Sequence, residues 1–142
     1  MVKLRWKDKW IDFVSVDWSG TDNQCSRQVA FSVPNNPYDK TFEQLGIALG
    51  DLIYLYDKKR FFIGTVTNRE KSAETGSATY TAKDFMHYLL NSSGTFKFKN
   101  TTPEKMTRKV CSDLKIKTGS LAVTNFKISK LIFDDQKMYD II

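Results

Sequence analysis

Two apolar runs constrain this fold more than any other stretch: Leu52–Tyr56 and Phe61–Val66, which are separated by a charged turn at residues 57–59. Neighbouring positions within each run are apolar, so both faces of each run are hydrophobic. Short two-sided runs around a tight polar turn predict a hairpin that is covered on both sides. One cover would be the interior of a barrel, and the other a packed helix or another subunit. Gly64 predicts a bulge or a barrel corner inside the second run.

Alternation of apolar and polar residues predicts the remaining strands. The first pair would be antiparallel, with a turn near Gly20 between its strands. Residues 38–49, with Phe42, Leu45 and Leu49, fit either a short helical turn or a loop. The expected strands are Trp10–Trp18, Arg27–Val33, Ala78–Ala82, Phe96–Lys99 and Leu121–Ile128.

Three segments favour helices instead. Apolar spacing predicts a short amphipathic helix over Lys83–Leu90. Thr102 and Pro103 form a typical N-cap and first position of a second helix, whose apolar residues repeat every four positions from Met106. Residues 133–142 predict a helix that begins at an aspartate and stops with its apolar side chains displayed, which we interpret as the truncated end of a longer protein.

The composition is that of a globular domain with a real core. The chain has 142 residues, 41% of them hydrophobic, which is enough for one domain. No apolar run reaches the roughly 20 residues that cross a bilayer, and no apolar segment follows the basic start, so we expect neither a membrane segment nor a signal peptide. Cys25 and Cys111 are too few for a stapled scaffold, and we expect two free thiols in a reducing cytoplasm.

Residues that could perform catalysis are scarce. His87 is the only histidine, and it lies in a predicted helix, where a surface or core-edge role is the ordinary one. One histidine and two distant cysteines build neither a catalytic triad nor a common zinc site. No pair of carboxylates is singled out by spacing, so we expect no enzyme, no catalytic, metal or cofactor-binding residues, and no cofactor. The carboxylates considered are Asp12, Asp17, Asp22, Asp51, Glu70 and Glu74.

Positive charge is concentrated in one region. The net charge is +6, and residues 97–130 hold nine of the 22 basic residues against two acidic ones. Such a region suits phosphate, a solvated face or an acidic partner. An OB-like barrel that binds single-stranded nucleic acid is the alternative function, since aromatic and basic residues interleave at residues 3–10 and 96–99. Alternating Phe and Lys is also typical of a half-buried edge strand.

Four segments, taken in order, resemble one family. They are a strand–turn–strand VSVDWSGTDNQCSRQVAFSV, a hairpin LGDLIYLYDKKRFFIGTVTNRE, a strand leading into a helix YTAKDFMHYLLNS, and a helix TPEKMTRKVCSDLKI. Together they resemble the N-terminal portion of the baseplate hub family of contractile phage tails, which includes late control protein D and the XkdQ-type protein of the PBSX prophage. Members of that family are much longer than this chain.

The resemblance implies a fold, an organisation and a role. The fold would be mainly β: a small antiparallel β-barrel of the tail-tube type with one or two short helices packed on it. Residues 1–95 would form the barrel hub domain, and residues 96–142 a helix-containing extension. The protein would be made in the bacterial host cytoplasm and reside in the virion, in the tail baseplate. It would join tail tube to spike as a trimer of its own copies, with tube and spike proteins as partners and nucleic acid only as the passing genome.

Overall fold

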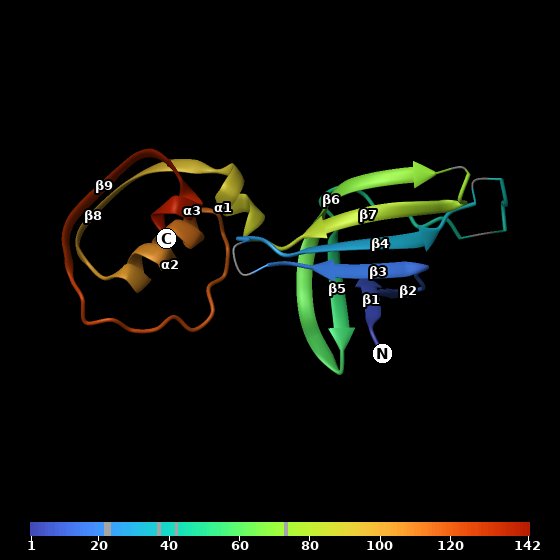
Figure 1. The fold of residues 1–142 in the computed structure, drawn as a ribbon, viewed down its shortest axis with the longest axis horizontal. Helices are drawn as coiled ribbons and strands as arrows, with labels where there is room; N and C mark the ends of the chain where they lie inside the picture. The colour runs from blue at the N-terminus through green and yellow to red at the C-terminus, as the bar shows by residue number, and fades with distance from the viewer. Residues whose placement is uncertain (22–23, 37, 42, 73) are drawn as a thin grey trace. The chain divides into compact units, whose positions relative to one another are not determined.

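A computed structural model describes the chain except for residues 22, 23, 37, 42 and 73. It divides into two compact units, Met1–Phe85 and Met86–Ile142. The first unit contains a seven-stranded sheet, and the second contains a two-stranded sheet with three helices (Figure 1).

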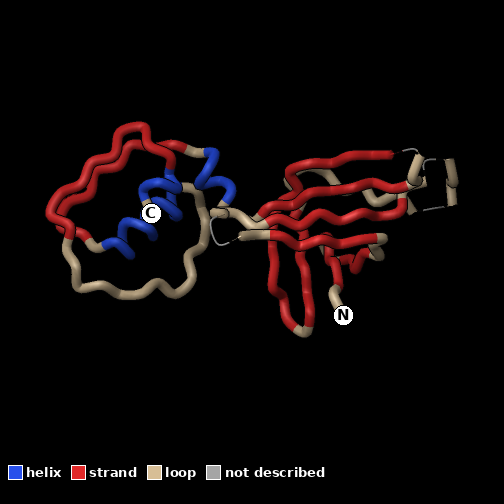
Figure 2. Tube along the Cα trace, in the orientation of Figure 1, coloured by secondary structure: helices blue, strands red, loops and turns tan. Residues whose placement is uncertain are grey.

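The sheet of the first unit is antiparallel throughout and has the order β2-β1-β5-β6-β7-β4-β3. It curls into a half-barrel, and its two edge strands, β2 and β3, are consecutive in the chain (Figure 2). This confirms the expectation of a mainly β, antiparallel fold. The strands are β1 Lys3–Trp6, β2 Lys9–Ile11, β3 Ser15–Ser19, β4 Gln28–Pro34, β5 Leu52–Asp57, β6 Lys59–Ser72 and β7 Ser77–Lys83.

Strand β6 belongs to both halves of the sheet. Its first half pairs with β5, and its second half pairs with β7 from Thr65 onward. Register shifts leave Phe61 opposite no β5 residue and Thr67 opposite no β7 residue, and such bulges bend a strand. Between them lies Gly64, where an added Cβ would come within 2.5 Å of the Lys83 carbonyl oxygen. Glycine at this corner therefore permits a close backbone approach, in line with the predicted bulge or corner.

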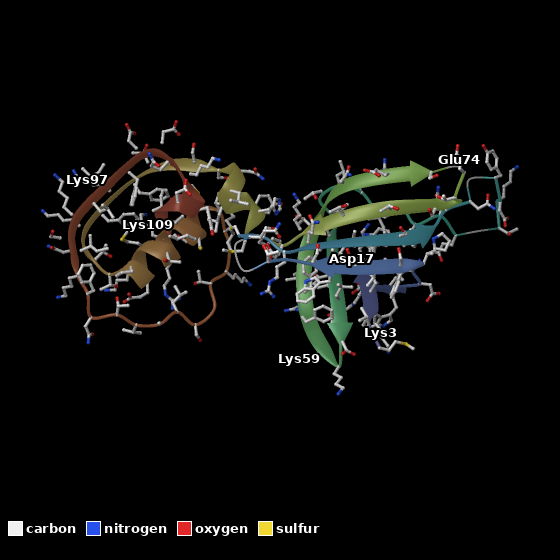
Figure 3. The ribbon with its side chains drawn as sticks, viewed as in Figure 1. Lys3, Asp17, Lys59, Glu74, Lys97 and Lys109 are labelled. Carbon is white, nitrogen blue, oxygen red and sulfur yellow. The ribbon has the colours of Figure 1, made fainter. Side chains whose placement is uncertain are left out.

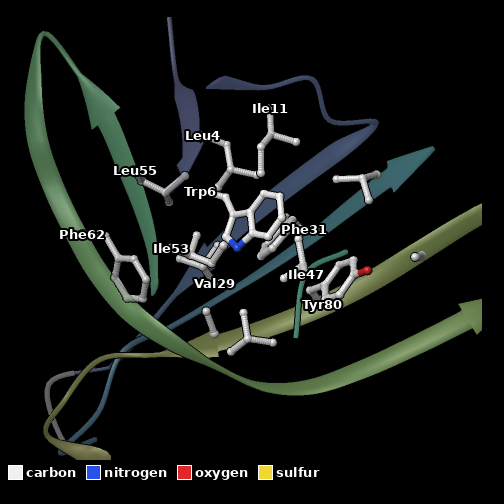
Figure 4. Close-up of a cluster of buried hydrophobic side chains, with 14 residues drawn as sticks. Leu4, Trp6, Ile11, Val29, Phe31, Ile47, Ile53, Leu55, Phe62 and Tyr80 are labelled. Carbon is white, nitrogen blue, oxygen red and sulfur yellow. The ribbon is translucent and has the colours of Figure 1, made fainter. Parts of the chain in front are cut away.

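The core fills the concave side of the sheet (Figure 4). Alternate residues of each strand point inward, as the two-residue period of a strand requires. The rings of Phe31 and Tyr80 stack with centroids 5.3 Å apart, and burial of each such side chain contributes roughly 1.5–3 kcal/mol. The core residues are Leu4, Trp6, Ile11, Val29, Phe31, Val33, Ile47, Ile53, Leu55, Phe62, Val66, Ala78, Tyr80 and Ala82.

For this unit the structure corrects one prediction, adds one strand and decides between two alternatives. The single strand expected at Trp10–Trp18 is wrong, because the chain bends after Ile11 and passes from pairing with β1 to pairing with β4. Strand β1 was not predicted at all. In residues 38–49, the described part is turn and loop without helix, and Phe42 lies outside the described residues.

The second unit is built on a long ribbon of β8, Ser93–Thr101, and β9, Ile128–Lys137. Its helices are α1 His87–Asn91, α2 Pro103–Asp113 and α3 Met138–Ile141. Helix α2 begins where predicted, after Thr102, and buries Met106, Val110 and Cys111. Phe96 and Phe98 are buried while Lys97 and Lys99 are exposed, which confirms the reading of this segment as a half-buried strand.

One prediction for this unit is wrong, and two expected helices are shorter than predicted. The strand expected at Leu121–Ile128 is mostly loop, and the helix expected over residues 133–142 begins only at Met138 because residues 133–137 belong to β9. An Asp–Asp pair suggests an N-cap locally, but here the hydroxyls of Thr95 and Ser93 donate to Asp134 (3.0 Å) and Asp135 (2.6 Å), across the ribbon. The helix expected over Lys83–Leu90 begins only at His87 because β7 extends to Lys83.

Candidate assembly surface

The convex side of the β5–β6 hairpin carries the apolar residues that the core does not use. Ile53, Leu55 and Phe62 point inward and are buried. Tyr54 pairs with Ile63 on the opposite face, and both are half-buried. The hairpin is therefore apolar on both faces, as predicted.

Trp10, on edge strand β2, covers part of this convex side. Its ring contacts Tyr56 edge-on, with centroids 5.3 Å apart, and 59% of Trp10 remains exposed. The Lys3 ammonium and the Arg5 guanidinium lie 5.8 and 6.0 Å from the Trp10 ring centroid. Arg60 lies 5.8 Å from the ring centroid of Tyr54. Cations at these distances are attracted to the negative face of an aromatic ring.

We call these six residues the aromatic–cationic face: Lys3, Arg5, Trp10, Tyr54, Tyr56 and Arg60. Interaction with the Tyr56 hydroxyl, together with the ion pair to Asp8, raises the pKa of Arg5, so its charge is fixed. Exposed Trp, Tyr and Arg are the residues that dominate binding energy at protein interfaces. The face is thus suited to protein–protein contact.

A polar anchor fixes the β1–β2 hairpin that presents Trp10. The indole N–H of buried Trp6 donates to the Asp51 carboxylate (2.8 Å), and the Ala48 amide donates to the same oxygen (3.0 Å). Hydrogen bonding from Ala48, supplemented by Trp6 and the nearby charge of Lys7, holds the pKa of Asp51 below its usual range. Asp51 therefore has a structural role at the turn before β5.

A second aromatic pair lies at the edge of the same unit. Trp18 of β3 contacts Phe61, the bulged residue of β6, with centroids 5.6 Å apart. The Arg27 guanidinium lies 5.4 Å from the Trp18 ring centroid. Both aromatic residues stay partly exposed, at 44% and 39%. The tip of the β5–β6 hairpin thus meets Trp10 through Tyr56 on its convex side, so the chain itself supplies part of the second cover expected for this hairpin. It meets Trp18 through Phe61 from the core-facing side of β3, because Trp18 pairs with the buried Val29.

These contacts do not follow from the predicted strands. The alternation of Lys3 and Arg5 with Leu4 and Trp6 is typical of a strand, and recognising strand β1 would have indicated a hairpin that carries Trp10. Nothing local indicates that β3 would meet the far end of β6, because that contact depends on the curl of the sheet.

The single histidine and the two cysteines are not among the residues of this face. His87 is in α1, where its ring stacks at a tilt on Tyr88 with centroids 4.0 Å apart. Neither thiol is in a disulfide, as expected: Cys25 is partly buried and Cys111 is buried. Burial raises the pKa of each thiol, so a smaller fraction of each is present as the reactive thiolate at neutral pH.

The candidate carboxylates that the structure describes are spread over separate strands and turns. Glu70 accepts a hydrogen bond from Asn68 (3.0 Å), while Asp17 and Glu74 are exposed; both are labelled in Figure 3. Asp22 lies outside the described residues. Among the residues that the structure describes, no three His, Cys, Asp or Glu side chains gather as metal ligands would. No helix in that same part of the chain is long and apolar enough to cross a bilayer.

Two curated relatives, both from Bacillus subtilis (strain 168), match the sequence. One is the uncharacterized protein YqbQ and the other is the phage-like element PBSX protein XkdQ. Each is 28% identical over 138 residues, which cover 94% of this chain and 41% of the relative. The chain thus spans about two-fifths of the length of these relatives.

Two solved structures share the fold. A tail protein from Neisseria meningitidis MC58 aligns over 97% of this chain and 42% of its own, with a TM-score of 0.75. The 43 kDa tail protein of prophage MuSo2 from Shewanella oneidensis aligns over 98% of this chain and 46% of its own, with a TM-score of 0.76. Both are 14% identical in sequence, so they bear on fold alone. The YQBQ-like family matches residues 16–142, and the chain belongs to that family.

Proposed function

We propose that this chain is a structural part of a phage or prophage tail, in the baseplate hub, where it joins the tail tube to the spike. The observation that carries the proposal is the combination of a tail-protein fold over nearly the whole chain with an exposed aromatic–cationic face. The relative named as a PBSX phage-like element protein supports the same class.

The proposed role is assembly and involves no catalysis. Trp10, Tyr54 and Tyr56 would be covered by a neighbouring subunit, and full burial of each large side chain contributes roughly 1.5–3 kcal/mol. Lys3 and Arg60 at the rim of the face would steer and orient docking. A closed ring of subunits would be stabilised by the sum of many modest contacts between neighbours rather than by one strong binding site.

The same proposal includes the organisation of the protein. Residues 1–95 would form the hub barrel and residues 96–142 the extension, with three copies in the assembly and tube and spike proteins as neighbours. Its location would be the virion tail.

Electron microscopy tests the location. Particles induced from the bacterium that carries the gene would be labelled with gold-coupled antibodies against this chain. We expect label only at the end of the tail distal to the head. Label along the whole shaft, or on the head, would contradict the hub role.

Incorporation of variants tests the face. Trp10→Ser in the otherwise unchanged protein should strongly reduce the amount of the protein in purified tails. Tyr38→Ser is the matched control and should be incorporated normally, since Tyr38 is an aromatic residue, 87% exposed, that lies between β4 and β5 and is not part of the face. Equal incorporation of both variants would contradict the proposed role of the aromatic–cationic face in assembly.

The alternative, a single-stranded nucleic-acid binder, has one observation in its favour: Trp10 is exposed between two cations. However, Phe96 and Phe98 are buried and cannot stack on bases. A mobility shift with single-stranded DNA that weakens steeply from about 50 to about 200 mM salt would support this alternative over the hub.

A further inference from the structure

The β8–β9 ribbon of the second unit has an exposed face made of lysines. The register places Lys99 directly opposite Lys130, and Lys97 directly opposite Ile132. Residues directly opposite each other in an antiparallel pair share a face, so these four lie together, on the side away from the buried Phe96 and Phe98. We call them the lysine face: Lys97, Lys99, Lys130 and Ile132. All four are exposed, and Figure 3 shows Lys97 directed away from its own unit.

No ion pair among the described residues compensates the charge on this face. Like charges directly opposite each other destabilise a sheet, and Lys99 and Lys130 form such a pair. The next carboxylate along the ribbon, Asp134, is held by the Thr95 hydroxyl. A pattern that costs stability in the isolated chain is expected where it serves a function.

The composition of the face favours a protein over a polyphosphate. Ile132 is 53% exposed among the lysines, and an apolar residue gains nothing from a phosphate backbone but gains from burial against another apolar side chain. The aromatic residues of the ribbon point inward, so they offer no stacking platform for bases.

We propose that the lysine face docks an extended acidic segment of a partner protein. Carboxylates on alternate residues of such a segment lie about 7 Å apart, which matches the alternate placement of Lys97 and Lys99 on β8. An apolar residue of the segment would cover Ile132. This docking site is separate from the aromatic–cationic face and does not depend on the hub role.

Peptide binding tests the proposal. The probe is a fluorescein-labelled peptide in which glutamate alternates with threonine, with one central valine, and its anisotropy is followed at about 50 and about 200 mM salt. The variant Lys97→Gln/Lys99→Gln/Lys130→Gln should bind about tenfold more weakly, since three exposed ion pairs are lost. The control Lys40→Gln/Lys59→Gln/Lys71→Gln removes the same charge from exposed positions of the first unit and should bind almost as the original protein does.

A stability measurement gives an independent readout. Lys99→Glu replaces the like-charge pair with an opposite-charge pair, so it should raise the unfolding midpoint of the second unit while weakening peptide binding. Lys97→Glu, opposite Ile132, should weaken binding with a smaller gain in stability. The proposal is overturned if Lys99→Glu lowers the midpoint or if both triple variants bind alike. It is also overturned if duplex DNA displaces the peptide from the same lysines at about 200 mM salt, which would assign the face to nucleic acid.

Discussion

Replacing Gly64 with alanine tests the reading of β6 as a strand that bends at one permissive position. The added Cβ would lie 2.5 Å from the backbone oxygen of Lys83 and 2.7 Å from its carbonyl carbon. Ordinary contacts to a carbon atom are about 3.5 Å, so β6 and β7 would have to separate by close to an ångström where Thr65 pairs with Lys83. Phe62 could turn aside, but a paired backbone cannot.

The expected loss follows from three contributions. Overpacking of a filled site costs about 1–3 kcal/mol, and a weakened backbone hydrogen bond costs about 1 kcal/mol. Alanine also reduces the conformational entropy of the unfolded chain relative to glycine, which stabilises the folded state by about 0.4–1 kcal/mol. The free energy of unfolding should therefore fall by about 2 kcal/mol, which lowers the melting temperature of a unit of this size by about 10 °C.

Tryptophan fluorescence isolates this effect. The three tryptophans, Trp6, Trp10 and Trp18, all belong to the first unit, so their emission during thermal unfolding reports on that unit. Gly46→Ala is the matched control, because a Cβ at Gly46 meets nothing within 4 Å, and it should be neutral or slightly stabilising. An unchanged midpoint for Gly64→Ala would refute the proposed close approach of β6 and β7.

Three further outcomes are expected. Asp51→Asn should lower the free energy of unfolding by about 1 kcal/mol at neutral pH. Because the pKa of Asp51 is lowered in the folded protein, the carboxylate stabilises the fold at pH values above the usual carboxyl pKa of about 3.9. This stabilisation is lost as the pH falls through the folded pKa. The two proteins should therefore converge in acid urea titrations, and a constant difference would contradict the assignment. Phe98→Ala should destabilise the second unit by about 3–5 kcal/mol while Lys97→Ala changes little, as measured by the helix signal in circular dichroism; equal losses would refute the half-buried strand. Cys25 should react with Ellman's reagent in the native protein and Cys111 only on unfolding, so Cys25→Ala should remove the fast phase, and a fast phase that survives would mean that Cys111 is accessible.

Local patterns predicted the elements whose stabilising contacts are close in sequence. The β5–β6 hairpin and the start of α2 at Thr102 were of this kind. Strands β1 and β9 were missed for one reason: each pairs with a strand far away along the chain, β5 and β8. At Asp134, an apparent helix start loses to a hydrogen bond from Thr95 across the ribbon.

The aromatic–cationic face was predictable only in part. The convex residues of the hairpin, such as Tyr54, follow from two-sided hydrophobicity. The arrival of Trp10 beside Tyr56 does not, because it requires the register between β1 and β5. The lysine face likewise depends on pairing, since Lys99 and Lys130 are separated by a helix and a long loop.

The double membership of β6 has a mechanical consequence. One continuous strand, β6, runs from the hairpin tip to the segment that pairs with β7. A pull on the tip along the strand axis would therefore load the β6–β7 backbone hydrogen bonds in shear. Bonds loaded in shear resist together, whereas those in a peeled strand break one after another. Force applied to the hairpin tip would therefore be resisted by the β6–β7 hydrogen bonds together.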